Sequence, residues 1–307
     1  MMPPRPSLPK RLLDRLRYMA FRALLAGLSV LPFSPRVRAF GWLTVHVIAP
    51  LAGYRRRVRR NLSMVWPDMG GAERQALTSR TLDNFGRTVM ENFCHADLGR
   101  HLQGTALEGD GLATLEKARR DKRPVLFVSA HFGNHEVPRH LLAAQGDRIG
   151  GIYRPFTNPH FDDHYRRTLA SVGGTVFVQG REGTVGFARY LQGGGWGILF
   201  YDLHQPRGDV LDFMGLPART ATSAAKLALK YDAALVPWFG IRQPDGLRFR
   251  AIIEAPIPPD DPVTMTRVLH ARLEARIADH PEQWMWVHRR WKSHEKALRT
   301  GVPLLRD

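Results

Sequence analysis

PVLFVSA, at residues 124–130, is the segment of this chain from which its fold class can be inferred. It is a short and almost uninterrupted apolar run, which is typical of a strand buried on both faces of a parallel sheet. The segment that follows it, HFGNHEVPRHLLAA, begins as a loop and becomes a helix. A buried strand that leads directly into a helix is a building unit of α/β domains.

Helical and strand-like segments alternate along the rest of the chain. Further strands are predicted at RIGGIYRP (148–155), TVFVQ (175–179), WGILFYD (196–202), ALVPWFGIR (234–242) and LRFRAIIEAP (247–256), with helical segments between or after them. Helical spacing of apolar residues also covers residues 71–104. We therefore predict an α/β fold in which a mixed, largely parallel sheet is covered by helices. Functional groups in this architecture collect at the carboxyl ends of the strands.

The amino end carries two apolar stretches, residues 18–32 and 40–54. Both are shorter than the roughly 20 apolar residues that cross a bilayer, and Arg22 interrupts the first. Cations precede the first stretch on an amphipathic pattern, which favours a helix that lies at the headgroup boundary. Buried core helices are the alternative. We predict a membrane-associated helical segment over residues 1–60 and the α/β domain over residues 61–307.

The overall charge points to a polyanionic partner. The chain has 45 Lys and Arg against 28 Asp and Glu, a formal charge of +17. Nucleic acid, an anionic membrane face, a phosphorylated substrate or an acidic protein would each fit this charge. The arginine cluster at residues 55–60 directly follows the second apolar stretch, where it would hold this face against an anionic cytoplasmic leaflet.

The strongest candidate site is the block His131-Phe132-Gly133-Asn134-His135-Glu136 at the end of the first strand. An imidazole held by a carboxylate through its other nitrogen is a general base near neutral pH, suited to removing a proton from a hydroxyl. Residues five apart on a regular helix point about 140° away from each other. His131 and Glu136 can therefore meet only if His131 lies in the turn and Glu136 on the first turn of the helix, and Gly133 supplies the flexibility for that turn.

Three other interpretations of this block stay open on the residues alone. His131, His135 and His140 could hold zinc together with Glu136, although the order is not H-E-x-x-H. A satisfied structural histidine is the second interpretation. The third is a serine or cysteine nucleophile elsewhere, but the chain has no G-x-S-x-G and its single cysteine, Cys94, lies in a helical stretch. Direct transfer without a covalent enzyme intermediate is therefore favoured.

The block His131 to Glu136 resembles the acyltransferase signature His-x4-Asp/Glu in the form found in the lipid A late acyltransferases. Further similar blocks are Arg60-Asn61-Leu62 with Trp66-Pro67, Tyr153-Arg154-Pro155 followed by Asn158-Pro159, Asp202 at the end of a glycine-rich strand, and PEQWMWVHRRW at residues 281–291. The resemblance implies a glycerolipid-acyltransferase-like fold, with residues 61–307 as the acyltransferase domain.

The same resemblance implies an enzyme at the cytoplasmic face of the bacterial inner membrane. It would move a fatty acyl chain from acyl carrier protein, less often coenzyme A, to a hydroxyl of a lipid A precursor. Neither a metal nor a cofactor is implied, because the thioester is a co-substrate. A rival acceptor for the same chemistry is another polar lipid, such as a glycerolipid, an aminolipid or a glycosylated phosphatidylinositol.

Carried over to this chain, the resemblance makes His131 the base that deprotonates the acceptor hydroxyl and Glu136 the carboxylate that orients this histidine. Arg154 would face the thioester oxyanion or a substrate phosphate, where a cation stabilises charge that develops in the transition state. A surface arginine at a strand end is the alternative for Arg154.

Further candidates for contacting the oxyanion or the substrate are Asn134, Arg181 and Asp202. Arg181 follows a predicted strand and could contact a diphosphate or an acidic carrier protein. Asp202 ends another strand, where it could orient an arginine, receive the acceptor hydroxyl, or simply cap a loop.

The tryptophans 284, 286 and 291 stand next to several cations. They could line an acyl groove, lie at the lipid interface, or pack in the core. Stacking of nucleic-acid bases is a further possibility, but no recognisable nucleic-acid module accompanies them, and we predict no nucleic-acid partner. Since acyl carrier protein is small and strongly acidic, we instead expect a basic docking face that includes Arg289 and Arg290.

Overall fold

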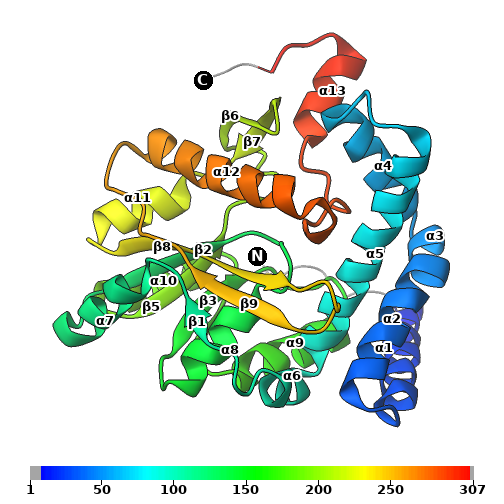
Figure 1. Cartoon of the computed structure of the whole chain (residues 1–307), viewed down its shortest axis with the longest axis horizontal. Coiled ribbons are helices and arrows are strands. Elements are labelled where there is room, and N and C mark those ends of the chain that lie inside the picture. Colours follow the sequence, from blue (N-terminus) through cyan, green and yellow to red (C-terminus); the bar gives the residue numbers. More distant parts are fainter. Residues whose placement is uncertain (1–7, 305–307) are drawn as a thin grey trace.

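The computed structural model describes residues 8–304 and shows an α/β fold (Figure 1). Seven strands form one sheet in the order β1-β9-β8-β2-β5-β3-β4, and β6 and β7 form a separate hairpin. Within the large sheet only β8 and β9 pair antiparallel, and the other neighbours are parallel. The predicted mixed, largely parallel sheet covered by helices is therefore confirmed.

The strands are β1 (Leu107–Glu108), β2 (Val125–Ser129), β3 (Ile149–Tyr153), β4 (Val176–Val178), β5 (Trp196–Phe200), β6 (Asp209–Phe213), β7 (Leu216–Thr220), β8 (Ala234–Arg242) and β9 (Phe249–Ile253). The helices are α1 (Leu8–Ser29), α2 (Phe33–Leu43), the π-helix η1 (Thr44–Ile48), α3 (Ala49–Leu51), α4 (Tyr54–Val65), α5 (Gly71–Phe93), α6 (His95–His101), α7 (Leu112–Asp121), α8 (Glu136–Ala144), α9 (Pro159–Ser171), α10 (Arg181–Gln192), α11 (Ser223–Lys230), α12 (Pro262–Asp279), the 3-10 helix η2 (Pro281–Gln283) and α13 (Lys292–Thr300).

The central strand β2 explains why its sequence is apolar throughout. It lies between β8 and β5, and all five of its residues are buried. Val125 and Phe127 belong to a core cluster with residues of α7 and α8, whereas Leu126 and Val128 belong to another with residues of α11 and α12. Because alternate side chains of a strand point to opposite faces, helices must cover both sides of the sheet. Figure 1 shows these helices above and below the strands.

The amino-terminal helices differ in how deeply they are buried. Val37 and Phe40 of α2 are buried and share a core cluster with Met90 of α5. Trp42, Val47 and Leu51 of the second apolar stretch are exposed, so membrane association of residues 1–60 stays a prediction. Several apolar side chains of α1 are exposed. The predicted boundary at residue 60 falls inside α4, and residues 1–7 of the predicted membrane-associated segment lie outside the described residues. None of the helices within residues 8–304 combines the length and the apolar character that crossing a membrane requires.

Candidate active site

The register of β2 and β5 brings His131 and Asp202 together. Ser129 is paired with Phe200, and His131 and Asp202 each follow two residues later. The Nδ1 atom of His131 lies 2.9 Å from Oδ1 of Asp202, and the backbone N–H of His131 donates to Oδ2 of the same carboxylate at 2.9 Å. The indole N–H of Trp284 also donates to this Oδ2, at 3.1 Å. Both oxygens of a buried carboxylate thus hold one histidine in place.

The ionised carboxylate of Asp202 determines which ring nitrogen of His131 donates to it. Burial alone would raise the pKa of Asp202, but the charge interaction with His131 and the two hydrogen bonds from His131 outweigh it, so the pKa of the carboxyl is lowered. An ionised carboxylate only accepts hydrogen bonds, so Nδ1 of His131 must carry a proton, and Nε2 is the ring nitrogen that faces away from the carboxylate. The side chain of His131 is 24% exposed, and within residues 8–304 no hydrogen bond occupies Nε2.

Glu136 does not orient His131, and that prediction is corrected. It is the first residue of α8, and its carboxylate bonds Nη1 of Arg139 at 3.1 Å and lies 3.8 Å from Nε2 of His135. Burial would raise the pKa of Glu136, but Arg139 and nearby histidines lower it to about 2. The ion pair fixes the start of α8 because Arg139 also donates to the carbonyls of Leu169 and Gly173. The importance of Glu136 for catalysis stays a prediction.

The buried side chain of Asn134 holds the loop between β2 and α8 in place and is not exposed to solvent at the active site. Its side chain is fully buried, its amide donates to Glu91 at 2.9 Å, and its carbonyl accepts the backbone N–H of Glu136. The neighbouring Gly133 has a φ of 53° and sits so close to the backbone of Gly240 that a Cβ would lie 2.0 Å from its carbonyl oxygen. The block is therefore rigid, and the position of Asn134 does not support the predicted contact with the oxyanion or substrate.

Arg154 and Arg181 lie at the same edge of the sheet as His131. Arg154 directly follows β3, and Arg181 begins α10, shortly after β4. In the strand order, β3 is next to β5, which carries Asp202 at its end. Both arginine side chains are exposed. The positions are compatible with contact to a substrate, and the two roles stay predictions.

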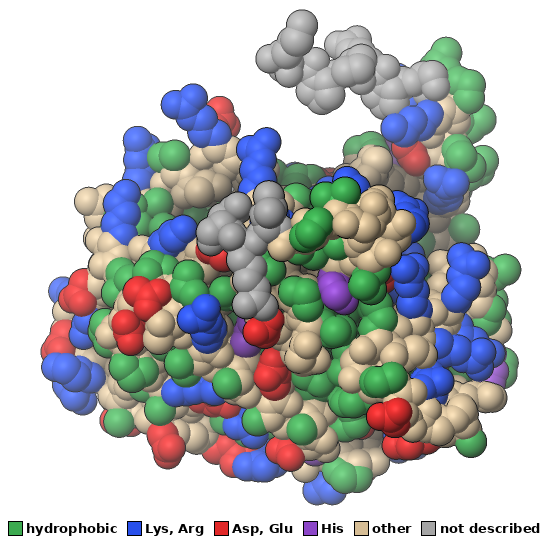
Figure 2. Space-filling view, turned by 90° about the horizontal axis from the view of Figure 1, so that it is seen from above, with side chains coloured by type: hydrophobic (Ala, Val, Ile, Leu, Met, Phe, Trp, Pro, Cys, Tyr) green, Lys and Arg blue, Asp and Glu red, His purple; other side chains and the backbone are tan. Residues whose placement is uncertain are grey.

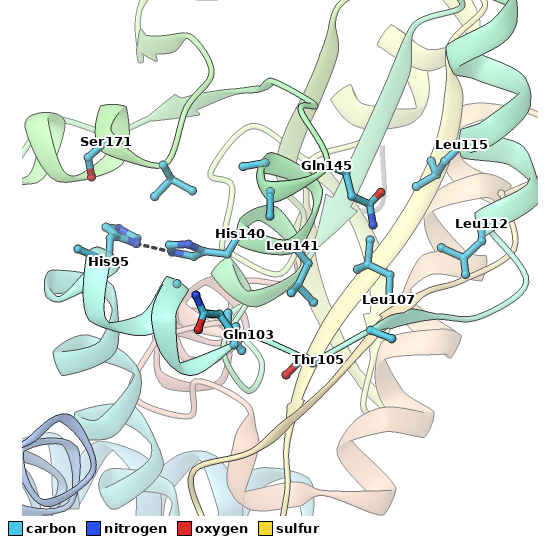
Figure 3. Close-up of a pocket in the computed structure, with 18 of the residues that line it drawn as sticks. His95, Gln103, Thr105, Leu107, Leu112, Leu115, His140, Leu141, Gln145 and Ser171 are labelled. Carbon is cyan, nitrogen blue, oxygen red and sulfur yellow. Dashed lines mark hydrogen bonds between the residues drawn. The ribbon is translucent and has the colours of Figure 1, made fainter.

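The zinc interpretation requires His140 beside His131, and the structure separates them. His140 lies on the far side of α8, where its Nε2 is 2.8 Å from Nδ1 of His95 on α6. This histidine pair borders a cavity of about 780 Å³ between α6, α7 and α8, shown in Figure 3, whose lining does not include His131. Burial lowers the pKa of His95 to about 4, so its ring is neutral at physiological pH.

The tryptophan block belongs to the core. Trp284, Trp286 and Trp291 are at most 2% exposed and contact one another edge-on or tilted. Of the two arginines expected in a docking face, Arg289 is exposed, but Arg290 is fully buried and donates to the carbonyls of Leu203 and Arg219. The prediction for Arg290 is therefore wrong. Core packing, and not a lipid or nucleic-acid surface, explains the aromatic residues.

Comparison with known proteins shows the family of this chain. The model of the family described as bacterial lipid A biosynthesis acyltransferase matches residues 9–293. The chain belongs to this family. It is thus an acyltransferase of lipid A biosynthesis, and the nucleic-acid-binding alternative and the rival lipid acceptors are set aside.

Several curated relatives of this lipid A acyltransferase are similar along most of their length. It is 29% identical to the lipid A biosynthesis lauroyltransferase of Escherichia coli (strain K12), over 253 residues that cover 80% of each chain. Identity to the lipid A biosynthesis myristoyltransferase of the same organism is 26% over 240 residues, covering 76% of this chain and 73% of the relative. Lipid A biosynthesis acyltransferase 2 of Shigella flexneri is 26% identical over 274 residues, 86% of each.

Two contacts of this acyltransferase's site escaped sequence reasoning. One is the hydrogen bond between His131 and the carboxylate of Asp202, and the other is the hydrogen bond that the indole of Trp284 donates to the same carboxylate. Each joins residues from distant parts of the chain, but a signal for the first exists. Both His131 and Asp202 end runs that read as buried strands, and pairing these strands in parallel would have placed the two residues side by side.

Proposed function

We propose that this acyltransferase moves a fatty acyl chain from the thioester of acyl carrier protein directly to a hydroxyl of a lipid A precursor. Coenzyme A thioesters would be poorer donors. The reaction class and the lipid A pathway follow from the family, whereas the donor and the direct mechanism are the proposal. The relatives carry the names lauroyltransferase and myristoyltransferase, so saturated chains of this size are the donors to try first.

The observation that carries the mechanism is the buried pair of His131 and Asp202. With Nδ1 held by the carboxylate, Nε2 takes the proton of the acceptor hydroxyl while the hydroxyl oxygen attacks the thioester carbonyl carbon. The tetrahedral intermediate collapses by breaking the carbon–sulfur bond, and the imidazolium returns its proton to the departing thiolate. Asp202 stabilises the imidazolium in between, and Arg154 faces the oxyanion.

A transfer assay with intact-mass readout tests this function. Purified protein, lauroyl or myristoyl carrier protein and a lipid A precursor should yield a lipid heavier by one fatty acid less one water, because an acyl group replaces the hydroxyl hydrogen. One free carrier thiol should appear per product. The enzyme itself should never gain the mass of an acyl chain. A trapped acylated enzyme would contradict direct transfer, and a lipid of unchanged mass would contradict the proposed donor and acceptor.

We further propose that residues 1–60 hold the enzyme at the cytoplasmic face of the inner membrane through α1. Four apolar side chains of α1, Leu8, Leu12, Leu16 and Met19, recur at steps of four and three residues and are 55–79% exposed. Such a stripe on a soluble helix has no partner inside the protein, whereas a lipid interface would bury it. The helix is tied to the catalytic part, since Asn158 donates to the backbone carbonyl of Asp14 and Tyr18 contacts His164.

Replacing Leu12 and Leu16 together by Asp should release the protein from lipid vesicles without unfolding it. Both side chains are more than half exposed, so the folded state loses little packing. Vesicle flotation should show at least a tenfold loss of bound protein, because burying two leucines contributes about 3–6 kcal/mol. Thermal unfolding should be unchanged. If the variant still floats, and high salt alone releases the wild-type protein, then electrostatic attraction and not apolar insertion holds it to the membrane.

A further inference from the structure

The helices α4 and α13 together present a strongly basic surface. We call it the α4–α13 basic face and define it by six exposed cations, Arg56, Arg59, Arg60, Arg289, Lys292 and Lys296. The two helices contain a single acidic residue, Glu295. In Figure 1 they lie side by side at the upper right, and Figure 2 shows Lys and Arg side chains gathered on the right of the face seen from above.

The only acid of these helices serves to fix them together. Glu295 is 8% exposed, and its two oxygens lie 3.3 Å from Nε of Arg60 and 3.3 Å from Nη2 of Arg289. The carboxylate therefore bridges α4 to the segment that precedes α13. Two of the six cations are partly neutralised by it. The remaining positive charge stays available for a partner on a surface whose geometry is set in advance.

The basic face is also fixed directly to the active site. Asn61 of α4 donates to the carbonyls of Trp286 and His288 at 2.7 and 2.8 Å, and Arg57 donates to the carbonyl of Val287 at 3.1 Å. The same segment contains Trp284, whose indole bonds the carboxylate that orients the catalytic base. A partner bound to α4 and α13 would thus be positioned relative to the reacting atoms through one short, buried segment.

We infer that the α4–α13 basic face docks an acidic carrier protein that delivers the acyl thioester on a flexible prosthetic arm. The inference rests on the proposed function, which makes such a protein the donor. Charge complementarity identifies the partner, because six cations around one internal acid would steer and orient a small, strongly acidic protein. With the carrier bound to this face, its flexible arm would bring the acyl thioester to His131.

The pattern of exposed residues favours a protein over a membrane as the occupant. A helix that lies in a lipid interface exposes apolar residues between its cations. Along α4 the exposed residues are Arg56, Arg59, Arg60 and Ser63, and no apolar side chain of this helix is exposed. On α13 a single apolar side chain among the described residues, Leu298, is strongly exposed, whereas four exposed apolar residues form a stripe along α1. The two surfaces therefore suit different partners, with lipid at α1 and the carrier at α4 and α13.

A charge-reversal experiment with two thioester donors tests this inference. The variant Arg56→Glu/Arg59→Glu/Lys296→Glu changes three cations outside the Glu295 bridge. The control Lys117→Glu/Arg120→Glu/Arg248→Glu changes the net charge by the same amount on exposed residues elsewhere. For each protein, kcat/KM is measured in detergent micelles with acyl carrier protein and with acyl-pantetheine, which has no protein to dock. The measurements run from low salt to near-physiological salt, where the Debye length falls to about 8 Å.

We expect the variant to lose a factor of at least ~10 in kcat/KM with the carrier at low salt, and to lose the salt dependence of the wild type. With acyl-pantetheine it should stay within about twofold of the wild type, as should the control with both donors. Equal losses with both donors would overturn the inference, and so would carrier kinetics of the variant that match those of the wild type. If such a variant also bound anionic vesicles more weakly than the wild type, the face would be a membrane contact instead. If the wild type itself does not prefer the carrier over acyl-pantetheine, the donor in the proposed function is wrong, whatever the variants do.

Discussion

His131→Ala is expected to reduce kcat/KM for acyl transfer by a factor of about 10²–10⁴, which is the usual contribution of a general base. Without Nε2, no described side chain is placed to accept the proton of the acceptor hydroxyl as it attacks the thioester. The side chain of His131 is partly exposed and the backbone contacts of the loop remain, so the variant should fold. Initial rates at saturating and at low acceptor concentration, together with thermal unfolding, check both expectations.

Two controls separate the loss of a base from a general disturbance of the loop. Added imidazole should restore part of the activity of His131→Ala, because a small base can enter the space that the side chain leaves. His135→Asn should lose far less activity, because the pKa of the buried His135 is lowered to about 4 by its burial and the ring points to Glu136. Near-normal activity of His131→Ala, or equal losses in both variants, would remove His131 from the mechanism.

Asp202→Asn is expected to lower kcat/KM by a similar factor of about 10²–10⁴, although it replaces a single atom. The backbone N–H of His131 and the indole of Trp284 both donate to Oδ2, so the amide oxygen must take that position. The amide NH₂ then faces Nδ1 of His131 and donates to it. The proton of the imidazole moves to Nε2, and the ring can no longer accept a proton from the hydroxyl.

Glu136→Gln provides the matched comparison, because it makes the same chemical change in the carboxylate of the His-x4-Glu block. Its main effect should be on stability, since it leaves Arg139 without its charge partner in a buried site. Breaking such a pair costs about 3–5 kcal/mol of unfolding free energy. Chemical denaturation measures this loss. The kcat/KM of Glu136→Gln, corrected for the folded fraction, should then exceed that of Asp202→Asn. The reverse order would mean that Glu136, and not Asp202, orients His131.

The fold could be predicted from sequence because buried strands leave a local signal. Apolar runs such as residues 124–130 need no knowledge of their partners to be recognised. Strand β1 was not predicted, because it has two residues and exists only through its pairing with β9. The hairpin of β6 and β7 also escaped prediction. Its strands mix exposed and buried residues and join through Met214 and Gly215, outside the sheet that the alternation of strands and helices describes.

The site was predictable residue by residue but not in its pairing. His131 stood out because an ionisable residue directly follows a buried strand, and Asp202 stood out for the same reason. Glu136 was paired with His131 through the resemblance to the His-x4-Asp/Glu signature, yet the start of α8 turns its carboxylate toward Arg139. The contact between His131 and Asp202 spans 71 positions and follows from which strands are neighbours in the sheet. Strand order is a property of the whole fold, and local patterns do not contain it.

The tautomer of His131 tests most directly the claim that Asp202 orients the catalytic base. Nitrogen-15 NMR of histidine-labelled protein, with the His131 signals assigned by comparison with His131→Ala, distinguishes a protonated ring nitrogen from an unprotonated one. In the wild type and in Glu136→Gln, Nδ1 should carry the proton and Nε2 should be unprotonated at neutral pH. In Asp202→Asn the proton should be on Nε2. An unchanged tautomer in Asp202→Asn, or an inverted one in Glu136→Gln, would contradict the orienting role of Asp202.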